Sequence, residues 1–226
     1  MPGAGGRQAG AEEVSTLHFP AKSDTGPDMA QADLIRQLRE YRSRWPGEAG
    51  TVDRFIDFVS SHPDCFERHL AIGHVTGSAW VVDRAGARVL LTHHKKLDLW
   101  VQLGGHADGD SDVLRVARRE AAEESGLAGL ELVPGGIFDV DVHRIPAGGE
   151  GPEHFHWDIR YAFRAAGGEA FRVSAESHEL RWVGIQSLAS VTAEESMLRM
   201  ARKWRRLWNP PGGDAEPDFR PPGPEK

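Results

Sequence analysis

Three glutamates, Glu120, Glu123 and Glu124, have the spacing of neighbours on one face of an α-helix. Three carboxylates this close repel one another unless a cation lies between them. Hard divalent cations such as Mg²⁺ take oxygen ligands of this kind and keep water or substrate phosphate in their other positions. The spacing therefore predicts a divalent-cation site, and the alternative is a solvent-exposed helix that is merely rich in charge.

Histidines form a second set of candidate ligands. His154 and His156 alternate along one predicted strand and therefore share a face of it. His106 directly follows a glycine pair at the start of the glutamate-containing stretch. Neutral imidazoles suit Zn²⁺ or Mn²⁺ better than Mg²⁺. His106, His154 and His156 are therefore candidates for a second metal site, and the alternatives are contacts to phosphate, ordinary hydrogen bonds or exposure to solvent.

A helix and the loop before it must position the glutamates. Asp110 or Ser111 is the predicted N-cap, because either side chain can accept from the free N–H groups of the first helical turn. The helix is expected to run to about Ser125, with Gly126 as the left-handed residue that ends it. The apolar side chains on its opposite side would pack on a sheet; they are Val113, Leu114, Val116 and Ala117.

The whole stretch from Gly104 to Leu127 resembles the Nudix box, G-x5-E-x7-R-E-U-x-E-E-x-G-U, where U is a bulky aliphatic residue. Gly105 matches the first glycine, and Ala121 is a small version of the first U. The remaining matches are Arg119, Glu120, Glu123, Glu124, Gly126 and Leu127. Ser111 stands where the family has its first Glu, a residue that mainly braces the loop and the arginine. Asp110 or Asp112 is the candidate for bracing Arg119 instead.

The resemblance implies an α/β fold, namely an α/β/α sandwich around a mixed sheet, with a small N-terminal helical extension in this chain. It also implies metal-dependent hydrolysis of a nucleoside diphosphate linked to another moiety. Mg²⁺ or Mn²⁺ would be held by Glu120, Glu123, Glu124 and the backbone carbonyl of Gly104. Family members often supply a general base from the loop before a Trp-containing strand. Glu176 and Glu179, both before Trp182, fit that placement, and Glu176 is the preferred candidate. The implied catalytic set is Arg119, Glu123, Glu124 and Glu176.

Two other functions remain open. Isopentenyl-diphosphate isomerases share the Nudix fold, with a His after the glycine turn and two ligands that alternate on a later strand. They also use a Cys in that turn, whereas Gly104 and Gly105 occupy it here and Cys65 lies far upstream. A catalytically silent Nudix fold that senses a ligand is the third possibility, which Ser111 keeps open. Metal-dependent turnover and the type of product would separate the three.

The rest of the chain predicts helices on both sides of a set of strands. Helical periodicity covers residues 29–44 and about 51–60, and a capping box at residues 192–195 opens a C-terminal helix. Strands are predicted at residues 72–82, 89–93, 99–103, 137–145, 153–164 and 171–173. Residues 176–183 are expected to form a loop that leads into a last strand. Alternation in the strand at 153–164 directs the aromatic side chains from Phe155 to Phe163 toward the core.

Composition limits the class of protein. The chain has 226 residues, a net charge of −7 and no long basic run, which argues against a nucleic-acid partner. No apolar segment could span a membrane, and the single cysteine, Cys65, indicates a reducing compartment. We therefore expect a cytoplasmic protein. The family resemblance implies a small, nucleotide-derived diphosphate substrate and allows a homodimer. The predicted organisation is a disordered tail at 1–28, a helical extension at 29–66, a Nudix domain at 67–208 and a disordered tail at 209–226.

Overall fold

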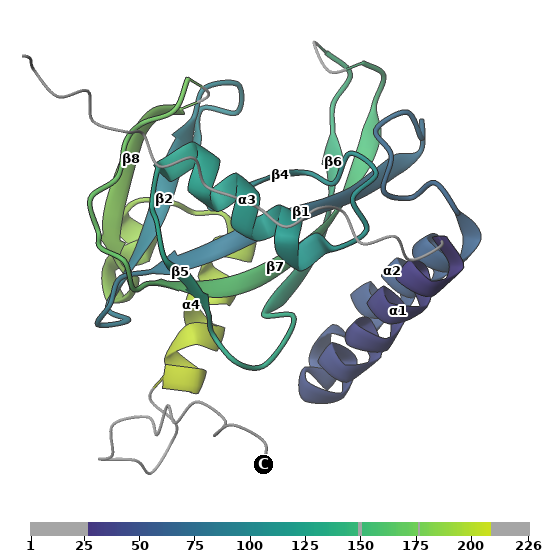
Figure 1. Ribbon diagram of the computed structural model, residues 1–226, viewed down its shortest axis with the longest axis horizontal. Coiled ribbons are helices and arrows are strands. Elements are labelled where there is room, and N and C mark those ends of the chain that lie inside the picture. Colours follow the sequence, from purple (N-terminus) through teal and green to yellow (C-terminus); the bar gives the residue numbers. More distant parts are fainter. Residues whose placement is uncertain (1–26, 149–150, 176, 209–226) are drawn as a thin grey trace, which may run out of the picture.

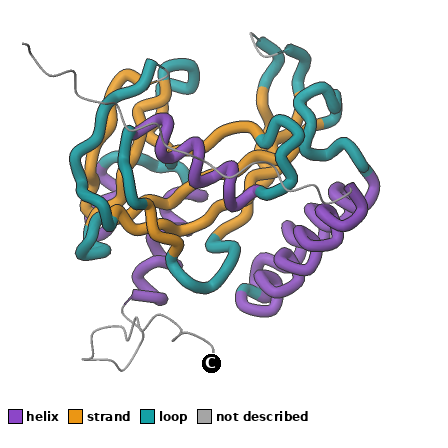
Figure 2. Tube along the Cα trace, in the orientation of Figure 1, coloured by secondary structure: helices purple, strands orange, loops and turns teal. Residues whose placement is uncertain are grey.

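An eight-stranded sheet lies at the centre of the molecule (Figure 1), with helical segments on both sides of the strands (Figure 2). The computed structural model describes residues 27–148, 151–175 and 177–208. The strands are β1 Gly73–Val82, β2 Arg88–His94, β3 Leu99–Val101, β4 Leu103–His106, β5 Leu130–Leu132, β6 Asp139–Ile145, β7 His154–Ala165 and β8 Ser177–Gly184. The α-helices are α1 Pro27–Arg44, α2 Ala49–Ser61, α3 Val113–Ser125 and α4 Glu195–Trp208, and short 3₁₀ helices lie at Pro46–Glu48 and Ile185–Ser190. The tails predicted at 1–28 and 209–226 lie outside the described residues, except for the first two residues of α1.

The sheet is mixed, as predicted. Its strand order is β3-β2-β1-β7-β5, with β4 beside β1, β6 beside β7 and β8 beside β2. β1 and β7 run parallel along the whole of β1, from Gly73 opposite Phe155 to Val82 opposite Arg164. β2 and β4 both pair antiparallel with β1. β1 therefore joins the glycine-containing strand β4 to the central strand β7.

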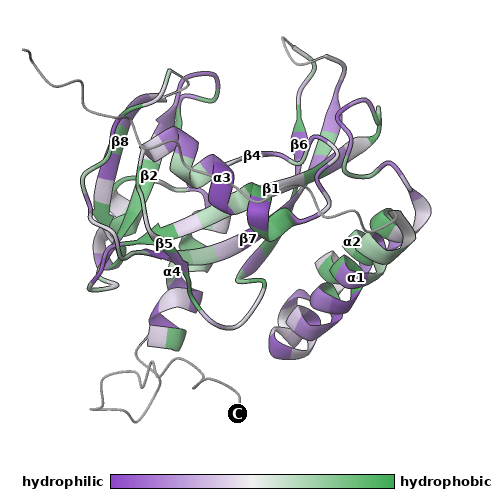
Figure 3. Cartoon of the chain, in the orientation of Figure 1, coloured by the Kyte–Doolittle hydropathy of each residue, from purple (hydrophilic) through white to green (hydrophobic). Residues whose placement is uncertain are grey.

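Two apolar clusters cover the two faces of the sheet. Val75 and Val81 of β1 pack in one cluster with side chains from α1, α2 and α3, whereas Trp80 and Val82 pack in the other with side chains from α4. Successive strand residues point to opposite faces, so α3 and α4 lie on opposite sides of the sheet (Figure 1). Figure 3 shows hydrophobic colouring along α2, which buries an apolar stripe against the sheet. Among the described residues, no helix has both the length and the apolar character needed to cross a membrane.

β7 is buried on both of its faces. The aromatic face is in the core as predicted, with Trp157, Tyr161 and Phe163 buried. The opposite face is buried too, although it carries His154, Asp158 and Arg160. The sequence pattern predicts two faces of different character, but not that the polar face would be covered as well.

Two predictions about the second half of the chain are wrong, and one strand was not predicted. Residues 171–173 form no strand, and most of the predicted loop at 176–183 is strand β8, which begins at Ser177. β8 pairs with β2 from Ser177 opposite His94 to Gly184 opposite Arg88, so backbone hydrogen bonds hold a polar segment in the sheet. β5 was not predicted; it has only three residues, too few to show a period, and pairs with the end of β7.

Candidate functional site

The glutamate-bearing helix α3 is fixed at both ends and along one side. Asp112, rather than Asp110 or Ser111, is its N-cap and accepts a hydrogen bond from the backbone N–H of Arg115 at 3.0 Å. Gly126 ends the helix with φ 67° and donates to the carbonyl of Ala122, as predicted. Along its length α3 lies directly on β1, because a Cβ added at Gly77 would come within 2.9 Å of Val116 Cγ1. The caps and the packing on β1 therefore fix the position of α3 and of the side chains on its opposite side.

Asp110 is not the cap because its carboxylate binds elsewhere. It accepts from the Arg115 guanidinium at 2.9 Å and from the backbone N–H of Asp112 at 3.0 Å. Its second guanidinium partner is Arg119, whose Nη1 lies 3.9 Å away. Of the two residues expected to brace Arg119, the structure therefore places Asp110 near it and uses Asp112 for the cap.

Arg119 connects the helix to the glycine strand. Its guanidinium donates to the Glu120 carboxylate at 2.7 Å and to the backbone carbonyl of His106 at 3.2 Å. Glu120 in turn lies against β4, since a Cβ added at Gly105 would be 2.5 Å from Glu120 Cδ. Any larger residue at position 105 would force this carboxylate to move, which gives a physical reason for glycine there.

The carboxylate set fits a hard cation. Glu120 is half-buried, Glu123 is exposed and Glu124 is buried with 8% of its surface exposed. Gly104, whose carbonyl is the fourth expected ligand, is the residue of β4 that directly precedes Gly105. The donors offered here are oxygens, the ligands that Mg²⁺ and Mn²⁺ prefer. Glu120 is paired with Arg119, and the oxygen donors of this set are of the kind that a hard divalent cation binds.

Only one of the two candidates for the general base lies among the described residues. Glu176 lies outside the described residues. Glu179 lies on β8 and is exposed, and the Arg181 guanidinium binds it at 2.9 Å. Arg181 also lies over the ring of Trp100, 4.7 Å from its centroid. Glu179 therefore already has an ion-pair partner at the surface.

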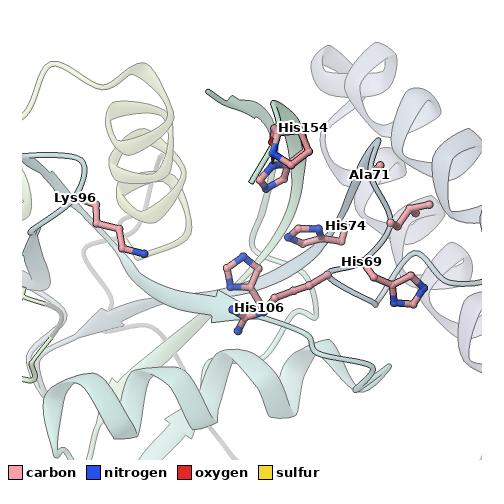
Figure 4. A pocket seen from close by; sticks show the side chains of 9 residues that line it. His69, Ala71, His74, Lys96, His106 and His154 are labelled. Atoms are coloured by element: carbon pink, nitrogen blue, oxygen red, sulfur yellow. Dashed lines mark hydrogen bonds between the residues drawn. The ribbon is translucent and has the colours of Figure 1, made fainter. Parts of the chain in front are cut away.

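Histidines from three strands meet on the face of the sheet opposite to α3 (Figure 4). The parallel register places His74 opposite His156, and β4 brings His106 opposite Thr76. His106 Nε2 lies 3.2 Å from His156 Nε2. The ring of His74 has its centroid 5.0 Å from those of His106, His154 and His156. The predicted histidines thus lie together, and His74 joins them without having been predicted.

The environment keeps the imidazoles of His74 and His156 neutral. Burial, together with the neighbouring His106 and His154, lowers the pKa of His74 to about 4. Burial and the surrounding histidines lower the pKa of His156 to about 2. A neutral ring has a nitrogen lone pair available, which is the form that binds metals.

A cavity of about 490 Å³ opens beside the histidines. His74, His106 and His154 contribute to its lining, as do Arg68 and Lys96. Figure 4 shows His74, His106 and His154 around a common space, with Lys96 reaching in from another part of the chain. The cavity thus combines imidazole and cationic side chains.

Asp158 lies next to this cluster on the same face but has a full set of partners. It accepts from Thr76 Oγ1 at 2.9 Å and Ser78 Oγ at 2.8 Å, and from Arg160 Nε at 2.7 Å. Arg160 also binds Asp139, which Arg199 of α4 binds at 2.7 Å. This buried ionic network joins β7 to α4, so we assign Asp158 a structural role.

Tryptophans lie within the two apolar clusters or at their edges. Trp80 and Trp157 are buried in the two apolar clusters, and Trp45 and Trp100 are only partly buried at their edges. Core packing is therefore the role of the first two.

Comparison with known proteins links the chain to one family. The family model described as "NUDIX domain" matches residues 73–204, more than half of the chain. No curated protein matches. Similar solved structures include an Ap4A hydrolase binary complex from C. elegans (17% identity, 57% of this chain and 93% of that chain covered, TM-score 0.47). A MutT protein from Methanosarcina mazei Go1 (18%, 61% and 96%, 0.46) and the Nudix hydrolase RenU from M. smegmatis (22%, 60% and 86%, 0.45) are also similar.

Proposed function

Because the chain belongs to the Nudix family, we propose that it is a metal-dependent hydrolase that cleaves a phosphoanhydride bond in a nucleoside diphosphate linked to another moiety. One observation carries this proposal: Arg119 holds Glu120 at 2.7 Å, on the helix that also presents Glu123 and Glu124. A solvent-exposed helix that is merely rich in charge would not need a glycine opposite one of its glutamates. Here the Glu120 carboxylate occupies the space beside Gly105.

The residues of the proposed site have different roles. Glu120, Glu123, Glu124 and the carbonyl of Gly104 would hold Mg²⁺ or Mn²⁺. Such a cation neutralises charge on the diphosphate and lowers the pKa of an attacking water. Arg119 keeps Glu120 in place through its second bond to the His106 carbonyl. Glu176 is the candidate general base, by its position in the sequence before Trp182.

The substrate is expected to be a small nucleotide-derived diphosphate, and the charge of the protein bears on how it would bind. The chain carries a net charge of −7, and the α3 carboxylates add local negative potential. An anionic diphosphate would be repelled from this surface unless a cation is bound there. Binding of the substrate would therefore depend on the metal. A cytoplasmic location, a homodimer and the domain limits at residues 29–66 and 67–208 remain predictions.

The test is a substrate panel with Mg²⁺ or Mn²⁺. It contains ADP-ribose, dinucleotides, dinucleoside polyphosphates, nucleotide sugars, coenzyme A, nucleoside triphosphates and isopentenyl diphosphate. We expect metal-dependent hydrolysis of one class. Glu124→Gln should lose at least about two decades of rate while remaining folded, because it removes charge from the metal site.

Glu131→Gln is the matched control, since it removes an exposed carboxylate from β5, away from α3. Near-normal rates in Glu124→Gln would contradict the assignment of the metal ligands. Turnover of isopentenyl diphosphate without hydrolysis would instead indicate an isomerase. Metal binding without any turnover across the panel would indicate a ligand sensor.

A further inference from the structure

His74 is a buried polar side chain that lacks hydrogen bonds. It is 3% exposed, and neither Nδ1 nor Nε2 has a hydrogen-bond partner among the described residues. Buried polar side chains nearly always have a partner, so a ring with two unsatisfied nitrogens calls for an explanation. His154 adds a second case, because its buried Nε2 also lacks a partner within the described residues. Both rings belong to the histidine cluster beside the cavity.

The nitrogens of three histidines are close enough to share one ion. His74, His106 and His156 each offer a ring nitrogen, and these three atoms lie within 4.8 Å of one another. Zn–N bonds of about 2.0–2.1 Å in a tetrahedral site place ligand nitrogens roughly 3.3 Å apart. The His106–His156 distance of 3.2 Å already meets this value. Small rotations of the His74 ring would complete the triad.

This cluster is distinct from the carboxylates of α3. Gly105 and His106 are successive residues of β4, so they face opposite sides of the strand. Glu120 lies against Gly105, on the side of α3. Figure 4 shows the His106 ring on the other side, directed toward His74 and away from the helix below the strand. A single ion therefore cannot be shared by both sets of donors.

We propose that His74, His106 and His156 bind a borderline transition-metal ion such as Zn²⁺, separately from the Mg²⁺ or Mn²⁺ of the α3 carboxylates. Three protein ligands leave a coordination position for water or for a ligand oxygen, the usual arrangement of a zinc site that is not purely structural. The cavity that His74 and His106 line lies beside these ligands. Arg68 and Lys96 line the same cavity, which favours an anionic oxygen group on any ligand that reaches the ion.

The test measures metal binding by the full chain, not turnover. Protein stripped with a chelator is titrated with Co²⁺, whose visible spectrum reports imidazole ligands, and then with Zn²⁺. We expect one equivalent of Co²⁺ to bind, to be displaced by Zn²⁺ and to resist excess Mg²⁺. Loss of a residue that only supports a metal ligand costs about 10- to 100-fold in affinity. His74→Ala and His156→Ala should therefore weaken binding by more than about 100-fold.

His178→Ala and Glu124→Gln are the controls. His178 is an exposed histidine of β8, and Glu124 belongs to the carboxylate set, so both variants should keep the Co²⁺ spectrum. Wild-type protein without a stoichiometric Co²⁺ or Zn²⁺ site, or His74→Ala with wild-type affinity, would overturn the proposal. If His74→Ala does not fold, His74→Gln takes its place and must show the same loss. Mg²⁺-dependent turnover is measured separately, so failure here leaves the proposed hydrolase unaffected.

Discussion

Gly105→Ala is expected to lower metal-dependent turnover by about 100-fold while leaving the fold intact. The new Cβ would lie 2.5 Å from Glu120 Cδ. Non-bonded carbon atoms prefer about 3.5–4.0 Å, so the carboxylate must move by about 1 Å or more. Glu120 is the flexible end of a half-buried side chain, which can move without disturbing the core. Its ion pair with Arg119 at 2.7 Å would be lost or rearranged.

Displacement by about 1 Å in a positioned catalytic set can cost roughly 100-fold in rate. We therefore expect kcat/KM for the substrate identified by the panel to fall by about that factor. Mn²⁺ affinity, followed by the loss of the free-ion signal in electron paramagnetic resonance, should fall as well. The thermal midpoint should change little, because the apolar contacts of α3 with β1 lie elsewhere.

Gly47→Ala is the matched control, since a Cβ at Gly47 would meet no atom within 4 Å. Its turnover and Mn²⁺ affinity should equal those of the wild type. Gly105→Ala with turnover within about threefold of wild type would refute the argument that Glu120 must lie against this strand. A large fall in its thermal midpoint would also refute it, because the substitution would then act on the fold and not on the carboxylate.

Two further predictions concern buried groups. Asp139 is fully buried and binds Arg160, Arg199 and Lys203, so Asp139→Ala should lower the free energy of unfolding by about 3–5 kcal/mol in urea titrations, because it leaves buried cations uncompensated. Asp33→Ala removes an exposed pair with Arg36 and should cost under about 1 kcal/mol; equal effects would contradict the role of the network. Burial raises the pKa of the Cys65 thiol to about 11, so at pH 8 the thiol should react with a disulfide reagent more than about 100-fold faster in urea than in the native state. Rapid labelling of native protein would show that Cys65 is accessible.

Local patterns predicted the elements that carry most of the fold. Helical periodicity identified α1 and α2, and alternation identified β7 and its aromatic core face, because these signals lie within one segment. The left-handed Gly126 was predicted for the same reason. The predicted N-cap of α3, Asp110 or Ser111, lies one or two residues before the observed one. Asp110 and Asp112 both have side chains suited to an N-cap, and only the position of Arg115 decides between them. When several consecutive residues could each serve as the N-cap, their residue types alone do not show which one does.

Contacts between distant strands could not be predicted from the sequence. His74 is a lone histidine in a largely apolar strand, and only its parallel register with His156 makes it a candidate ligand. The same register buries Arg160 and Asp158 beside Thr76 and Ser78, which turns an apparently polar face into an interior. Period-two alternation assigns residues to faces but does not say which strand lies next to which. His74 was therefore not predicted as a candidate ligand because the sequence does not give the order of the strands. The chemistry of the side chain was not misinterpreted.

β4 supplies both candidate sites, and its alternation explains how they can coexist. Gly105 faces the oxygen donors of α3, and His106 faces the nitrogen donors of β1 and β7. Oxygen donors favour Mg²⁺ and Mn²⁺, whereas imidazoles favour Zn²⁺, so the two sets would select different ions. The backbone still links them, because Arg119 binds both Glu120 and the His106 carbonyl. Deleting the His106 side chain would therefore remove a ligand from one site while leaving in place the carbonyl that steadies the other.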